Sequence, residues 1–206
     1  ADPENRYLWR FHERRMEAEV VRDSILAAAG QLDRQLGGPD LGLESGDTIL
    51  RRSLYFTVHP EGGRLEFMSV FDPPDPLECY RREESVVPQQ ALAMTNSRIM
   101  LSQSRLLARE LWSELEPKWP DETARESAFI SAAFARILAR YPTDAERTVC
   151  MEFLEEQVRL FQEAGPDQLS GDAAAISVSA STDPHMRARE SLIGAVFSHN
   201  DFVTIR

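Results

Sequence analysis

The sequence lacks several features that mark common classes of protein. No run approaches the roughly 18 apolar residues that a membrane-spanning helix needs. An excess of basic residues is also missing, and the formal net charge is −11. Binding to nucleic acid depends on Lys and Arg side chains that neutralise phosphates, so this charge argues against a nucleic-acid partner.

Cysteine is scarce. The two cysteines, Cys79 and Cys150, form neither a C-x-x-C nor a C-x-x-C-H pattern. The sequence therefore gives no support to a zinc ribbon, a thioredoxin-like pair or a c-type haem attached to this chain. We interpret Cys150 as a small core residue in a helical apolar stripe. A disulfide between the two cysteines is the alternative in an oxidising compartment.

Signatures of catalysis are missing too. The chain has no G-x-S-x-G elbow, and its glycine pairs at 37–38 and 62–63 form turns rather than a phosphate-binding loop. The four histidines, His12, His59, His185 and His199, show no metal-ligand spacing, and we interpret them as surface or packing residues. We assign no catalytic residue, cofactor or metal to this chain.

The apolar residues recur mainly at helical spacing. With 42% hydrophobic and 28% charged residues, the 206-residue chain has ordinary globular composition. The pattern predicts a mainly α domain of five to six helices with a small extended or hairpin region in the first third. Helices are expected from about 13 to the Gly-Gly-Pro stop at 37–39, from 88, from a cap at Asn96, and over 122–141, 144–164 and 184–198.

Local signals support some of these boundaries. Thr143 and Glu146 have the spacing of a capping box, in which each side chain bonds the backbone N–H of the other. Residues 51–58 are rich in β-branched and aromatic types and predict a strand, with a second extended piece over 65–71. Three prolines over 72–76 predict a rigid loop, and 166–182 a flexible insertion.

Several stretches together resemble one family. They are 2–6 (Asp-Pro-Glu-Asn-Arg), 15–19 with 22–23, 37–39, 52–55, 71–75 with Cys79 and Arg82, and 88–92 with Asn96. The set resembles the planctomycete cytochrome-C-associated domain of unknown function, the C-terminal module of large secreted planctomycete and verrucomicrobial proteins. Ser97 and Arg98 depart from the acidic residue and proline that often follow the asparagine.

The resemblance implies an extracytoplasmic location and upstream domains in the same protein. Haem is implied only for those upstream segments. Within that family the first matched stretch lies well inside the domain, so we expect residues 1–206 to be a single domain or the C-terminal part of a larger one. The resemblance implies no reaction.

One polar cluster is a candidate site. Two aspartates on the proline loop lie between arginine pairs and near polar helix residues: Arg51, Arg52, Asp72, Asp75, Arg81, Arg82, Gln89 and Asn96, with Glu83, Glu84 and Gln90 beside them. Arginine forks match the oxyanions of a carboxylate or sulfate, and paired carboxylates can act as acid and base. The favoured interpretation is simpler: arginine–carboxylate pairs brace the loop, and Asn96 caps a helix.

The sequence therefore favours a non-catalytic interaction or scaffold module of a larger protein. The alternative is part of a polysaccharide-binding or hydrolase site for acidic or sulfated glycans, which the arginine pairs would contact. The aromatic residues Tyr7, Trp9 and Phe11 are expected to be exposed if they pack on a part of the protein outside this chain.

Overall fold

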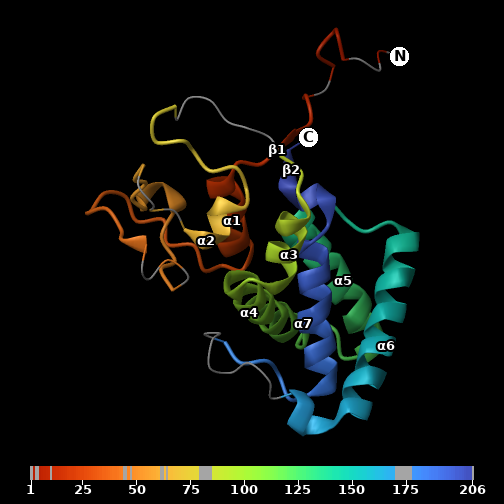
Figure 1. Cartoon of the computed structure of the whole chain (residues 1–206). Helices are drawn as coiled ribbons and strands as arrows, with labels where there is room; N and C mark the ends of the chain where they lie inside the picture. Colours follow the sequence, from red (N-terminus) through yellow and green to blue (C-terminus); the bar gives the residue numbers. More distant parts are fainter. Residues whose placement is uncertain are drawn as a thin grey trace.

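The computed structural model describes residues 2, 5–9, 11–43, 46, 48–60, 63, 65–78, 85–169 and 178–205. Figure 1 shows a mainly helical molecule, as the sequence predicts. Seven α-helices lie within the described residues: α1 (Ala18–Ala28), α2 (Glu66–Ser69), α3 (Pro88–Asn96), α4 (Arg98–Leu115), α5 (Glu122–Leu138), α6 (Asp144–Leu169) and α7 (Pro184–Phe197). The count exceeds the expected five to six because α2 is a single turn.

Helix α7 is the centre of the packing. It contacts α3, α4, α5 and α6, and α4 and α6 lie along opposite sides of it (Figure 1). Ile193 and Phe197 of α7 are completely buried, as are Phe129 and Ile130 of α5. These side chains recur at helical spacing, so burying each apolar stripe against its neighbours builds one continuous core.

The segment before α1 and the C-terminal segment are joined by a two-stranded sheet. Strand β1 (Arg14–Arg15) pairs antiparallel with β2 (Thr204–Ile205), and the Met16 N–H donates to the carbonyl of Val203 at 2.8 Å. A short 3₁₀ turn, η3 (Asn200–Val203), leads from α7 into β2. The contact places the start of α1 beside the end of α7, which sequence periodicity does not predict.

The predicted strands in the first third are not regular strands. Residues 53–55 form the 3₁₀ turn η2 (Ser53–Tyr55), and 66–69 form α2, with isolated bridges at Asp33–Arg51, Leu41–Phe56 and His59–Gly63. At the start of this region the physical reason is the buried guanidinium of Arg22, which binds the carbonyls of Ile49 and Arg51. Those carbonyls are then satisfied by a side chain instead of a neighbouring strand.

Three helix ends differ from the prediction. Helix α1 ends well before the glycine pair at 37–38, because Gly30, at φ 68°, already takes the left-handed conformation that stops a helix. Helix α4 is capped by Ser97, whose hydroxyl accepts from the Met100 N–H, so Asn96 is the last residue of α3 and not the cap. Helix α6 continues past Gly165 to Leu169.

Other boundaries agree with the sequence. Thr143 and Glu146 form the predicted capping box: the Thr143 N–H donates to Glu146 at 2.7 Å, and the Glu146 N–H donates to the Thr143 hydroxyl at 3.3 Å. Within the predicted insertion, 166–169 are helical, 170–177 lie outside the described residues, and Arg105 binds the carbonyl of Val178. No helix among the described residues is both long and apolar enough to cross a membrane.

Candidate functional site

One highly connected polar group is Arg22, which lies in α1 and is only 2% exposed. Its guanidinium donates to the carbonyls of Gly46, Ile49 and Arg51 and to the hydroxyl of Ser53. It also lies over the ring of Phe56, 5.0 Å from the centroid. One cation from a helix therefore satisfies the backbone of a loop region that has almost no regular structure of its own.

Asp23, the next residue of α1, binds the same region through its carboxylate. Its Oδ1 accepts from the N–H of Ser53 at 2.8 Å and from the Ser53 hydroxyl at 2.7 Å. Its Oδ2 lies 3.9 Å from Nε of Arg52, a long ion contact. Two stretches that the sequence singled out, 22–23 and 52–55, thus meet in the fold.

A groove of about 550 Å³ opens beside this network, between α1 and the two loops that cross it. Two guanidiniums, two carboxylates and one hydroxyl line it together with aliphatic side chains: Glu19, Val20, Asp23, Ser24, Ala27, Leu32, Arg34, Leu36, Arg52 and Leu54. Of the eight predicted cluster residues, Arg52 lines this groove.

The guanidinium of Arg51 binds a different part of the chain, the turn at Gly37. Its Nη2 donates to the carbonyls of Gln35 and Gly37, and its guanidinium carbon lies 4.0 Å from the centroid of the Tyr55 ring. The Tyr55 hydroxyl in turn accepts from the N–H of Gly37 at 2.9 Å. Arg51 is therefore a structural brace for the turn at Gly37.

Within its described residues, the proline loop is fastened by hydrogen bonds from a serine and from backbone. Asp72, with a positive φ of 54°, accepts from both the N–H and the hydroxyl of Ser85 at 2.7 to 2.9 Å. Asp75 accepts from the N–H of Leu77 within its own turn. These described contacts come from a serine and from backbone, while Arg81, Arg82, Glu83 and Glu84 lie outside the described residues.

Gln90, which the sequence analysis placed beside the cluster, joins this loop to the helices. Its amide nitrogen donates to the carbonyls of Val70 and Ser85, and its Oε1 accepts from Arg15 at 3.0 Å. Gln90 is 4% exposed, whereas Gln89 and Asn96 are exposed. The structure thus distributes the described members of the predicted cluster over separate regions instead of bringing them to one centre.

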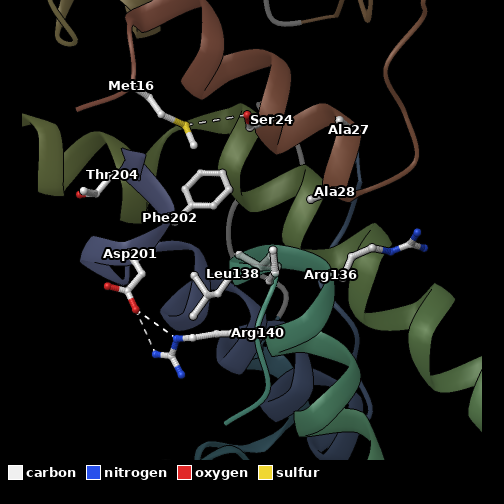
Figure 2. A pocket seen from close by; sticks show the side chains of 12 residues that line it. Met16, Ser24, Ala27, Ala28, Arg136, Leu138, Arg140, Asp201, Phe202 and Thr204 are labelled. Atoms are coloured by element: carbon white, nitrogen blue, oxygen red, sulfur yellow. Dashed lines mark hydrogen bonds and ion pairs between the residues drawn. The ribbon is translucent and has the colours of Figure 1, made fainter. Parts of the chain in front are cut away.

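A second hollow, of about 540 Å³, lies where α1 meets the end of α5 and the C-terminal segment (Figure 2). Arg140 points across it to Asp201, and its guanidinium also pairs with Glu146 at 2.7 Å. The Arg140 guanidinium and two hydrogen bonds from Thr143 lower the pKa of Glu146 to about 2. Two carboxylates thus already engage the guanidinium of Arg140 in this hollow.

Glu122 and Glu126 of α5 and His185 of α7 each place one ligand atom within 4.8 Å of the others. That is the kind of cluster that could bind a metal ion. The two glutamates are already paired with a guanidinium, because Arg189 contacts Glu126 at 3.0 Å and Glu122 at 3.6 Å. Burial lowers the pKa of Arg189, although Glu126 opposes this. The arrangement is that of a buried arginine neutralised by two glutamates.

Neither Arg22 nor Arg189 was assigned to a polar cluster from the sequence, although Arg22 lies in a matched stretch. Each is almost fully buried, and each lies on the apolar face of its helix, as Ile25 does in α1 and Ile193 in α7. An arginine at a buried position of an apolar stripe is the signal that could have identified them, since such a charge must find partners inside the fold.

The fold and its polar contacts define a helical module whose motif residues mainly hold its own irregular region together. Residues 1–154 match the family described as PSD1, protein of unknown function (DUF1553). The match covers well over half of the chain, so the protein belongs to this family, in agreement with the resemblance seen in its motifs. Neither a curated protein nor a solved structure matches the chain.

Proposed function

We propose that the chain is a non-catalytic interaction module of a larger extracytoplasmic protein. The observation that carries the proposal is the aromatic arm, defined as Tyr7, Leu8, Trp9 and Phe11. Their exposed fractions are 87%, 72%, 64% and 57%. In Figure 1 this segment leads away from the helices, starting near the β1–β2 contact.

Four large apolar side chains in five residues are costly to leave in water. Each contributes roughly 1.5 to 3 kcal/mol when it is fully buried. Contiguous exposed apolar patches commonly mark protein contacts. The partner we propose is another folded domain of the same polypeptide, and the family resemblance supports an extracytoplasmic setting for it.

The carboxylates of the motif stretches also favour a non-catalytic role. Asp23 and Asp72 accept two or more hydrogen bonds each from Ser53 and Ser85. A carboxylate that is held in this way orients its loop. A turnover by the isolated chain that is lost on changing Asp72 or Asp75 to Asn would contradict the proposal.

The arm can be tested by site-specific photocrosslinking. A photoreactive amino acid replaces Trp9 in the intact natural gene product, and the crosslinked peptides are identified by mass spectrometry. We expect crosslinks to peptides of the same polypeptide that lie outside these 206 residues. A matched variant with the crosslinker at Arg159, on the exposed face of α6, should give few of them. Crosslinks confined to residues 1–206 would sink the domain-contact proposal.

A glycan-binding role is the second candidate, and the groove lined by Arg34 and Arg52 favours it. Guanidiniums bind the carboxylates or sulfates of acidic polysaccharides bidentately. Titration of sulfated and neutral glycans against wild type, Arg52→Ala and Arg82→Ala tests it. Preferential binding of the acidic polymers, weakened in either variant, is the expected result, and absent or equal binding removes the candidate.

A further inference from the structure

A third hollow, of about 520 Å³, is lined by residues of α3, α4 and α7 and shares no lining residue with the groove beside α1. We infer that it binds a small uncharged molecule that combines an aromatic ring with an amide group. The inference goes beyond both candidate functions, because it depends neither on the aromatic arm nor on that groove.

The hollow contains a buried hydroxyl that the protein leaves without a partner. Ser104 of α4 lines it and is 4% exposed, and among the described residues its Oγ has no hydrogen-bond partner. A hydroxyl withdrawn from water is unfavourable unless another group meets it. An O–H group in this position can donate to a carbonyl oxygen of a ligand.

Gly194 of α7 leaves the space beside this hydroxyl unfilled. It lines the same hollow, and a Cβ at Gly194 would lie 3.7 Å from Oγ of Ser104 and would meet no other described atom of a neighbouring helix within 4 Å. The φ angle of Gly194 is not positive, so its backbone conformation does not require glycine. What glycine provides here is room next to Ser104.

Two further hydroxyls in the lining can accept hydrogen bonds. Ser191 and Ser198 donate to the carbonyls of Arg187 and Gly194 within their own helical turns. Their hydrogens are thus engaged, while their oxygens keep acceptor capacity. One free donor beside acceptor oxygens matches the C=O and N–H groups of an amide.

Two methionines supply an apolar side for an aromatic ring. Met94 and Met100 line the hollow and are 4% and 1% exposed. Methionine thioethers make favourable contacts with aromatic rings, and the flexible side chain adapts to the shape of a ligand. The volume of the hollow lies within the usual range for small-molecule sites, roughly 300 to 1,000 Å³.

The charged side chains that line the hollow already have partners in the protein. Glu190 pairs with Arg109 at 2.7 Å and lies 3.6 Å from Arg187. Arg105 donates to the carbonyl of Val178 at 2.7 Å. A charged ligand would lose its hydration without meeting an unengaged charge of opposite sign, so the chemistry favours an uncharged one.

Titration of the isotope-labelled chain with benzamide, followed by the chemical shifts of backbone amides, tests the site. Shifts around Ser104 and Gly194 should change. Ser104→Ala should weaken binding about three- to tenfold, which is the worth of one neutral hydrogen bond. Gly194→Ala places a methyl group beside the hydroxyl and should weaken binding to a similar degree. Ser113→Ala, at an exposed serine of α4, is the matched control and should bind as wild type does.

The two substitutions in the hollow should not destabilise the free protein. Gly194→Ala replaces a poor helix former and should raise the melting temperature by about 2 to 4 °C. Ser104→Ala removes a buried hydroxyl that has no partner, so the melting temperature should stay the same or rise. A loss of affinity in variants that are at least as stable as wild type cannot come from unfolding.

Toluene and benzoate are the matched ligands. If toluene binds as tightly as benzamide, the hydrogen bond to Ser104 is wrong, and if benzoate binds more tightly, the uncharged class is wrong. If benzamide binds and neither Ser104→Ala nor Gly194→Ala weakens it, the site lies elsewhere. If benzamide causes no shifts up to about 20 mM, a range weaker than a millimolar Kd, water alone fills the hollow and the inference fails.

Discussion

The guanidinium carbon of Arg189 lies 3.3 Å from the centre of the Trp112 indole ring. The same guanidinium pairs with Glu126 at 3.0 Å. One buried cation thus joins α4, α5 and α7 through an aromatic face and a carboxylate. Stacking on an indole is worth roughly 2 kcal/mol when the cation is desolvated, so this contact stabilises the helix bundle as well as neutralising a charge.

Arg189→Met should lower the free energy of unfolding by about 3 kcal/mol. The substitution fills most of the space over Trp112 but leaves Glu126, which is largely buried, without its partner. Urea denaturation followed by circular dichroism measures the change. Adding Glu126→Gln should restore part of the loss, and a double-mutant cycle that shows simple additivity would rule out the coupling.

Arg22→Ala should be among the most destabilising substitutions, with a loss of about 3 to 5 kcal/mol. It removes the donor for three backbone carbonyls and one hydroxyl in a region whose described residues form no sheet that could satisfy them. Urea denaturation of the variant measures the loss, and amide hydrogen exchange should show faster exchange around residues 46–53. The exposed Arg159→Ala is the control and should leave the denaturation midpoint unchanged, and an equal effect of both substitutions would contradict this account.

Glu146 should make the free energy of unfolding fall at acid pH. Its pKa is lowered to about 2 by Arg140 and by the hydrogen bonds from Thr143. A carboxyl whose pKa falls on folding stabilises the folded state above its unfolded pKa of about 4.3, and the contribution is lost as pH falls toward 2. Because solvent reaches the pair, we expect on the order of 1 to 2 kcal/mol.

The measurement for Glu146 is the free energy of unfolding at several pH values between 6 and 2, for wild type and Glu146→Gln. The two curves should converge at the acid end, since protonated Glu146 resembles glutamine. Glu152→Gln, at an exposed position of α6, serves as the matched variant. Curves for wild type and Glu146→Gln that stay parallel over this pH range would contradict the prediction.

Cys150 should react slowly with thiol reagents in the folded protein. It carries a buried, free thiol, and burial raises the pKa of that thiol, with the charge of Glu146 adding to the effect. The thiolate is the reactive form, so both accessibility and ionisation oppose reaction. In a Cys79→Ser background, Ellman's reagent should label the native chain slowly and the urea-unfolded chain rapidly. Equally fast labelling of both states would contradict the burial.

The local prediction succeeded where a signal is complete within a few residues. The capping box of Thr143 and Glu146 and the start of α3 at Pro88 depend only on neighbouring backbone donors. Helix ends were less predictable where two residues could each stop or cap the helix. Gly30 ended α1 before the glycine pair at 37–38, and Ser97 took the cap expected of Asn96.

The polar cluster was only partly predictable for a related reason. Arg51 and Arg52 are neighbours in sequence, yet one binds the carbonyls at Gln35 and Gly37 and the other lines the groove beside α1. Sequence proximity cannot show where a long side chain ends. Nor could it show that Ser85 and Gln90 fasten the proline loop, because those bonds span 13 and 20 residues.

The sequence by itself determined the helical class, the family and most of the stretches that become helices. Apolar periodicity and helix capping depend on residues that are close together in the sequence. Only the tertiary structure decided which charges are buried and what they hold. The roles of Arg22 and Arg189 depend on contacts with segments distant in the chain. Burying either charge without those partners would cost more free energy than any local conformational preference contributes.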